Sequence, residues 1–125
     1  MLKAQIRKRL GELSLSIDLS VAKGITVLRG ESGSGKTTIA NLLSRALKPD
    51  EGEIELEGCS VFSTARGINL APEARGIGFV FQTARLLPHL SVEENIRFPQ
   101  TAGKRRPRVD FAEVVEILGL ERLLH

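Results

Sequence analysis

The stretch RGESGSGKTTIA, residues 29–40, decides the fold of this chain. It contains the spacing Gly30-x-x-x-x-Gly35-Lys36-Thr37, in which glycines let the backbone fold tightly around an anion. In such a turn successive N–H groups point inward, where they can hold the oxygens of a phosphate. The spacing therefore predicts a phosphate-binding loop.

Both flanks of this loop predict the secondary structure that phosphate binding requires. The apolar run at 25–28 predicts a buried strand before the loop. After it, apolar residues at i, i+3, i+4, i+7 and i+8 predict a helix over 37–47, which Pro49 ends. The loop would then lie at the helix N-terminus, where the helix dipole adds positive potential.

ATP with Mg²⁺ is the ligand that this strand, P-loop and helix predict. Lys36 would reach the β- and γ-phosphates and act in catalysis, the Thr37 hydroxyl would bind Mg²⁺, and Thr38 would reach the α-phosphate. The residues predicted to bind the nucleotide are Gly30, Glu31, Ser32, Gly33, Ser34, Gly35, Lys36, Thr37 and Thr38.

Other segments predict further strands around this unit. Residues 13–21 alternate apolar and polar side chains, which is typical of a half-buried strand in an antiparallel sheet. Residues 53–57 alternate in the same way after a predicted turn at 50–52. We predict a loop over 59–76 and a compact apolar strand over 77–81, which Gln82 follows directly.

Two helices are predicted in the last third of the chain. Ser91 and Glu94 form a capping box that opens a short helix, and Pro99 is predicted to close it. A basic linker at 103–108 follows; it contains no aromatic residue to stack on bases and predicts a solvated loop rather than a nucleic-acid site. A second box, Asp110 with Glu113, opens a helix that ends at Gly119.

Length and composition predict one soluble globular domain, in which these strands and helices would form an α/β fold. The chain has 125 residues, 42% of them hydrophobic, a net charge of +3 and no apolar run near the ~20 residues of a membrane span. Its single cysteine, Cys59, excludes an internal disulfide and fits a reducing cytoplasm.

The segment GIGFVFQTARLLPHLSVEENI, residues 76–96, resembles the Q-loop of ATP-binding cassette (ABC) ATPases. The resemblance implies that Gln82 contacts Mg²⁺ and the attacking water, as a catalytic and metal-binding residue. It also implies that the loop at about 83–90 contacts a membrane permease. Such subunits work in pairs and lie peripherally on the cytoplasmic face of the bacterial inner membrane.

The same resemblance implies a P-loop NTPase fold of the ABC type. Residues 1–90 would form the antiparallel β-subdomain and the P-loop core through the Q-loop, and 91–125 would begin the α-helical subdomain. Within the family, residues 67–92 are most similar to the ATP-binding subunits of bacterial molybdate importers. The aromatic residue that usually stacks on adenine has no counterpart, because the matching position is about Leu10 and the chain has no Tyr or Trp.

Three elements that ABC ATPases use for hydrolysis are not found in the sequence. They are a Walker B Asp–Glu pair after an apolar strand, an LSGGQ-like signature, and a switch histidine, which neither His89 nor His125 resembles in position. We therefore expect an incomplete, N-terminal half of an ABC ATPase domain that binds ATP without hydrolysing it efficiently. Unpaired apolar edges would make it poorly soluble as a monomer.

Two other functions remain open from the sequence. One is a P-loop kinase that phosphorylates a small metabolite, and the other is a nucleotide-binding ABC protein without a role in transport. A kinase of that kind usually begins with the P-loop strand, whereas here about 20 strand-forming residues precede it. The segment after Gln82 favours the importer.

Overall fold

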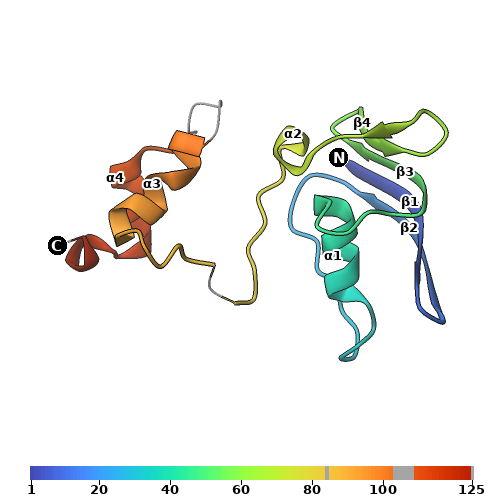
Figure 1. Cartoon of the computed structure of the whole chain (residues 1–125), viewed down its shortest axis with the longest axis horizontal. Coiled ribbons are helices and arrows are strands. Elements are labelled where there is room, and N and C mark those ends of the chain that lie inside the picture. Colours follow the sequence, from blue (N-terminus) through green and yellow to red (C-terminus); the bar gives the residue numbers. More distant parts are fainter. Residues whose placement is uncertain (84, 103–108, 125) are drawn as a thin grey trace. The chain divides into compact units, whose positions relative to one another are not determined.

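The computed structural model describes residues 1–83, 85–102 and 109–124. The chain divides into two compact units, Met1–Phe79 and Val80–His125 (Figure 1). The first contains the sheet and the P-loop, and the second contains Gln82 and two helices. The predicted division at residue 90 remains a prediction.

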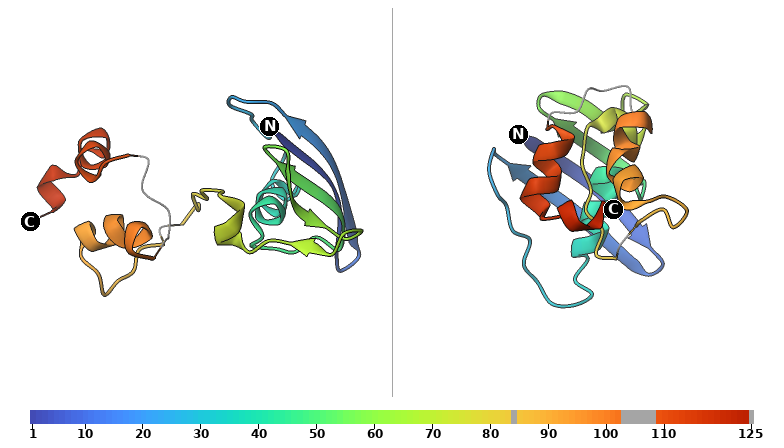
Figure 2. Two further views of the ribbon diagram at one scale, coloured as in Figure 1. Left: turned by 90° about the horizontal axis from the view of Figure 1, so that it is seen from above. Right: turned by 90° about the vertical axis from the view of Figure 1, so that its left-hand side faces the viewer.

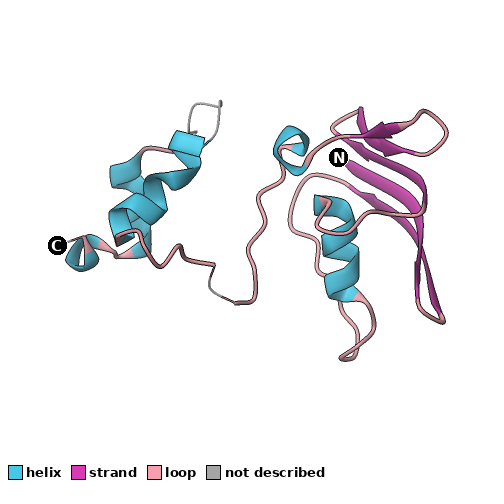
Figure 3. Ribbon diagram, viewed as in Figure 1, coloured by secondary structure: helices cyan, strands magenta, loops and turns pink. Residues whose placement is uncertain are grey.

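A five-stranded antiparallel sheet forms the first unit, with the strand order β2-β1-β3-β4-β5 (Figure 3). The strands are β1 (Leu2–Leu10), β2 (Leu13–Val21), β3 (Glu51–Leu56), β4 (Cys59–Ser63) and β5 (Ile68–Asn69). The strand predicted at 13–21 is confirmed as β2. Its register places Ile17 opposite Ile6 of β1, and both side chains are buried as the alternation requires.

Helix α1 (Lys36–Ser44) packs against one face of this sheet (Figure 2). Leu42 is completely buried and belongs to the same core as side chains from β1 to β4. These core residues are Ala4, Ile6, Ile17, Leu42, Ile54, Val61 and Phe62. The core therefore fixes the helix that begins at the P-loop.

The predicted helix end at residue 47 is wrong by three residues. Arg45 adopts a left-handed conformation with φ 68°, which stops α1 at Ser44. The Leu47 N–H then donates to the Asn41 carbonyl at 2.9 Å and closes the turn. Side chains beyond the helix still pack on the core, so the apolar spacing continued past the true end.

The predicted turn at 50–52 is also wrong in part, because Glu51 and Gly52 lie in β3 opposite β1. Gly52 has a φ of 110°, and a Cβ there would lie 2.0 Å from the Gln5 carbonyl oxygen. Only glycine allows the two strands to approach this closely. The glycine at position 52, which suggested a turn in the sequence, is therefore explained by the close approach of two strands.

Asp50, directly before β3, is hydrogen-bonded to the end of β1. Its carboxylate accepts hydrogen bonds from the Arg9 N–H at 2.8 Å and from the Lys8 ammonium at 2.7 Å. These two donors hold the pKa of Asp50 below its usual range.

The prediction of a loop over 59–76 is wrong, since β4, β5 and the short helix α2 (Pro72–Arg75) occupy it. The register of β3 with β4 shifts between Ile54 and Glu55. This irregularity leaves 61–63 buried as three consecutive residues. The sequence of β4 therefore lacks the alternation of buried and exposed side chains by which a half-buried strand is recognised.

The strands predicted at 25–28 and 77–81 are not formed in the structure. Ile25 and Val80 are each 97% exposed, and Val27 is 80% exposed. A strand needs a neighbour for its ladder of hydrogen bonds. Among the described residues the sheet ends at β2 and β5, and neither segment pairs with it.

The second unit contains α3 (Val92–Ala102), α4 (Phe111–Leu118) and a 3₁₀ turn (Glu121–Leu123). The Ser91 capping box is confirmed: Ser91 N–H donates to Glu94 Oε2 at 2.7 Å, and Glu94 N–H donates to Ser91 Oγ at 3.2 Å. The predicted stop at Pro99 is wrong, because α3 continues to Ala102. Proline removes one hydrogen bond of the helix, and this loss does not end α3.

The N-terminal cap of α4 is confirmed at Asp110, whose carboxylate accepts from the Ala112 N–H at 3.2 Å. Gly119 ends the helix as predicted, with φ 62°. The Arg97 guanidinium lies 3.7 Å from the centre of the Phe111 ring and joins α3 to α4. The basic linker at 103–108 lies outside the described residues.

Candidate nucleotide site

The loop before α1 has the backbone geometry of an anion-binding turn. Gly33 and Gly35 have φ values of 82° and 89°, and the Ser34 N–H donates to the Glu31 carbonyl at 3.2 Å. Gly35 is the N-cap of α1 and supplies no side-chain hydrogen bond. The N–H groups of the first helical turn therefore have no acceptor within the helix and remain available to phosphate oxygens.

Two side chains lie close to glycines of this loop. A Cβ on Gly30 would lie 2.7 Å from Ser34 Oγ, so a larger residue at this position would require the Ser34 hydroxyl to move. On the sheet side, Leu15 of β2 approaches to 3.6 Å from the point where a Cβ on Gly35 would stand. Leu15 therefore places β2 beside the glycine that caps α1.

Lys36 lies across the loop rather than pointing away from it. Its ammonium donates to the Gly30 carbonyl at 2.8 Å, to the Glu31 carbonyl at 2.6 Å and to Ser34 Oγ at 3.3 Å. The positive charge is consequently held against the backbone of the loop that leads into the free helical N–H groups. This is a suitable arrangement for the oxygens of a triphosphate.

The structure brings all nine predicted nucleotide-binding residues, 30–38, together in this loop and the first turn of α1. Thr37 is exposed, as a side chain that binds Mg²⁺ must be, and Thr38 is half-buried. Gln82 belongs to the second unit, and its place beside the phosphates remains a prediction.

The described residues contain no group of three or more His, Cys, Asp or Glu side chains that could hold a metal ion. A threonine hydroxyl beside bound phosphates is nevertheless a suitable Mg²⁺ site, because Mg²⁺ takes few protein ligands and shares the phosphate oxygens. The donor set of the P-loop therefore fits Mg²⁺ bound together with a nucleotide.

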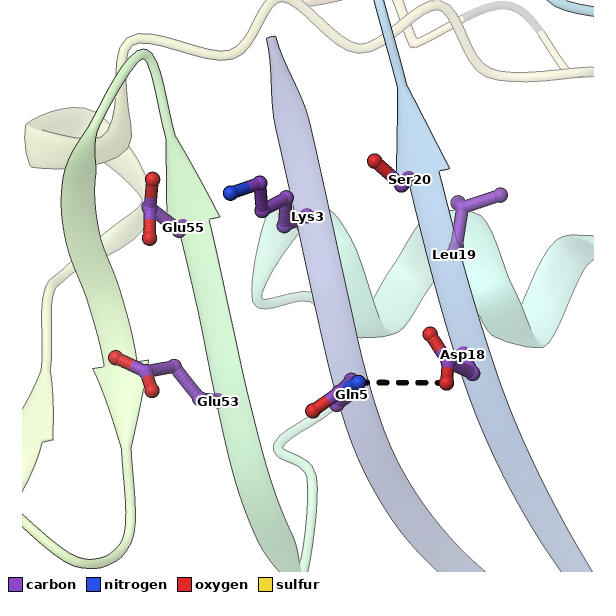
Figure 4. A pocket seen from close by; sticks show the side chains of 7 residues that line it. All are labelled: Lys3, Gln5, Asp18, Leu19, Ser20, Glu53 and Glu55. Atoms are coloured by element: carbon purple, nitrogen blue, oxygen red, sulfur yellow. Dashed lines mark hydrogen bonds between the residues drawn. The ribbon is translucent and has the colours of Figure 1, made fainter.

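A second concave region, of about 350 Å³, lies on the outer face of the sheet (Figure 4). Asp18, Glu53 and Glu55 line it against a single ammonium, that of Lys3. Gln5 donates from Nε2 to the Asp18 carboxylate at 3.3 Å. Three carboxylates would repel a triphosphate, so this hollow is not the nucleotide site.

Asn95 of α3 organises the loop that follows Gln82. Its Oδ1 accepts from the Leu87 N–H at 2.8 Å. Its Nδ2 donates to the carbonyls of Leu87, Leu90 and Ser91 at 3.2, 3.0 and 2.9 Å. The sequence does not reveal this role of Asn95, because an asparagine within a helix carries no pattern that indicates bonds to a neighbouring loop.

The ordered loop forms one wall of an apolar pocket of about 420 Å³ in the second unit. Leu86 is 71% exposed at this pocket. The other apolar residues that line it include Leu87, Pro88, Leu90, Ile96 and Leu120.

In the described part of the chain, none of the helices is long and apolar enough to cross a membrane.

Comparison with curated proteins finds close relatives over nearly the whole chain. The molybdenum import ATP-binding protein ModC of Paramagnetospirillum magneticum is 46% identical over 127 residues, which cover 99% of this chain and 34% of that protein. ModC of Vibrio cholerae is 47% identical over 121 residues, which cover 96% of this chain and 32% of that protein. The chain thus spans about a third of the length of these relatives.

Solved structures with the same fold include the dimeric ABC transporter cassette MJ0796, with a TM-score of 0.69 and 28% identity. The match covers 100% of this chain and 60% of MJ0796. A post-hydrolysis state of MJ0796 bound to ADP and Pi matches with a TM-score of 0.68, also at 28% identity, over 99% of this chain and 60% of that one. These likenesses confirm the predicted α/β fold of the ABC type.

The family model described as "ABC transporter" matches residues 14–125. The match includes all of β2 except its first residue, together with the P-loop, Gln82 and both helices of the second unit. The chain therefore belongs to the ABC transporter family.

Proposed function

We propose that this chain binds Mg²⁺-ATP at its P-loop, as the ATP-binding part of an importer for molybdate or a similar oxyanion. The observation that carries the proposal is the Lys36 ammonium, which is bonded to the backbone of the glycine loop directly before the N–H groups that open α1. ATP hydrolysis coupled to uptake is the activity that we propose for the whole protein.

The residues of the loop would act on the triphosphate by position and charge. Lys36 and the N–H groups of the loop would stabilise the negative charge that develops on the γ-phosphoryl oxygens during transfer. Thr37 and Gln82 would hold Mg²⁺, an ion that supplies positive charge to the β- and γ-phosphates when bound. Gln82 would also orient the attacking water.

The paired strands before the P-loop support the importer over a small-metabolite kinase. β1 and β2 pair along nine residues each, and Leu15 of β2 lies beside Gly35 of the loop, so these strands pack next to the predicted nucleotide site. The relatives named as molybdenum import proteins support molybdate as the solute. The permease and the solute-binding protein of such a system would select the solute.

A permease subunit is the partner that we propose for the loop after Gln82. The apolar pocket beside 86–90 supports this contact, because exposed leucines next to an ordered loop suit a short helix of a membrane protein. The chain would lie peripherally on the cytoplasmic face of the membrane. A second ATP-binding subunit would pair with it, as the dimeric MJ0796 cassette suggests.

Titration with ATP in the presence and absence of Mg²⁺ tests the nucleotide site. We expect Mg²⁺ to strengthen ATP binding, and Thr37→Val and Gln82→Ala each to remove part of that gain while leaving Mg²⁺-free binding within about twofold. Isothermal titration calorimetry gives the dissociation constants, and Thr26→Val serves as a control outside the loop. The proposal fails if the folded wild-type chain does not bind ATP.

Substitution at the apolar pocket tests the permease contact. Leu86→Glu should reduce capture of the chain by vesicles that contain the molybdate permease at least about tenfold, because a charge would enter an apolar interface. Ile117→Glu on α4 is the matched control, since Ile117 is equally exposed at 71% and does not line the pocket. Equal capture of both variants would contradict this docking surface.

A further inference from the structure

Arg75, at the end of α2, is buried to 6% exposure although it carries a full charge. Its Nη1 donates to the Leu43 carbonyl at 2.7 Å and to the Leu42 carbonyl at 3.4 Å. These carbonyls belong to the last turn of α1, where they have no partner within the helix. Arg75 therefore caps the C-terminus of the P-loop helix from a distant part of the chain.

The other nitrogens of the guanidinium fasten this cap to the segment after β5. Nε donates to the Leu70 carbonyl at 3.2 Å, and Nη2 donates to Asn69 Oδ1 at 3.4 Å. The same Asn69 oxygen accepts from Arg45 Nε at 3.1 Å, so it lies between two positive charges. Every nitrogen of Arg75 thus has an acceptor.

Arg75 forms no ion pair with a carboxylate in the described part of the chain. Its charge instead faces the negative end of the α1 dipole, where a cation is stabilising. Burial, together with the positive charge of Arg45, lowers the pKa of Arg75 from its ordinary value. Burial of this charge is tolerated because the negative end of the helix dipole and the hydrogen bonds to the carbonyls offset the loss of hydration.

The helix that Arg75 holds is short, and its other end is the nucleotide site. α1 has nine residues, a length at which a helix in water is marginal without tertiary contacts. Loss of the cap would leave two carbonyl groups unsatisfied next to Leu42, which is completely buried. The last turn would loosen, and the N–H groups at the first turn would lose their fixed position.

We propose that Arg75 is a positioning residue for the nucleotide site, which it acts on through α1 without touching the ligand. The inference rests on the proposed function, since it concerns binding of phosphate at the P-loop. It predicts that the effect of Arg75 grows with the number of phosphates that the first turn of α1 must hold. A contribution to overall stability alone would affect all nucleotides equally.

The experiment compares ATP, ADP and AMP binding to three variants of the full chain. Arg75→Met removes the charge and the hydrogen bonds, whereas Arg75→Lys keeps the charge and loses the planar fork. Arg66→Met is the matched control, because Arg66 pairs with Glu53 on the outer sheet face. This variant removes the same charge at a place away from α1. Dissociation constants come from competition against a fluorescent ATP analogue, at a temperature where circular dichroism shows the chain folded.

We expect Arg75→Met to weaken ATP binding about tenfold, ADP binding less, and AMP binding less than about twofold. Arg75→Lys should fall between Arg75→Met and the wild type, and Arg66→Met should match the wild type. An equal loss for the three nucleotides, or no loss, would overturn the positioning role.

Failure of the proposed function would be seen separately, as a folded wild-type chain that does not bind any of the three nucleotides. If Arg75→Met does not fold, Arg75→Lys carries the same comparison. If neither variant folds, Arg75 serves the fold itself and the positioning role is overturned.

Discussion

A chain carrying Lys36→Ala should bind Mg²⁺-ATP about a hundredfold more weakly than the wild type, since each charged hydrogen bond contributes about 1.5–3 kcal/mol. The substitution removes the ammonium that would reach the β- and γ-phosphates. It also removes the hydrogen bonds to the carbonyls of Gly30 and Glu31, so the loop loses the donor that holds it closed. Both effects weaken the same site.

Lys48→Ala is the control for this experiment. Lys48 lies on the exposed surface just beyond α1, so its removal changes the net charge equally without touching the loop. Calorimetric titration should give an unchanged dissociation constant for Lys48→Ala. Retention of wild-type affinity by Lys36→Ala would show that ATP does not bind at the P-loop.

Gly52→Ala should lower the free energy of unfolding by about 3–5 kcal/mol, which combines backbone strain with steric overlap. The Cβ would lie 2.0 Å from the Gln5 carbonyl oxygen and 2.7 Å from the Ile6 Cα. Both contacts are with the backbone of β1, which cannot move without breaking its pairing with β2. The added methyl group would therefore destabilise the whole sheet.

Gly58→Ala separates the two causes of this loss. Gly58 also has a positive φ, 80°, but nothing lies within 4 Å of the point where its Cβ would stand. Urea denaturation should show a loss of about 1–2 kcal/mol for Gly58→Ala, from strain alone. Equal losses in the two variants would mean that β1 yields to the added methyl group.

The P-loop could be predicted because its geometry depends on neighbours within a few residues. The glycines, Lys36 and the start of α1 are specified by spacing alone, and the structure places them together. The same holds for the cap at Ser91, where donor and acceptor are three residues apart. Local hydrogen bonds leave a local pattern.

The features that escaped prediction depend on contacts between distant parts of the chain. Arg75 bonds to carbonyls more than thirty residues away, and nothing beside it in the sequence reveals them. The irregular pairing of β3 with β4 hid a strand because it buries Phe62 and both of its neighbours. The runs at 25–28 and 77–81 show the converse, since apolar composition does not make a strand without a partner.

Asn95 gives the loop at 87–91 a mechanical property. One side chain bonds to four backbone groups of that loop, so the loop and the first turns of α3 resist bending relative to each other. A force applied at Leu87 or Leu90 is then delivered to the helix instead of being absorbed by a soft hinge. A single amide group, within one turn of the helix start, thus adds to the stiffness that the Ser91 capping box already gives this segment.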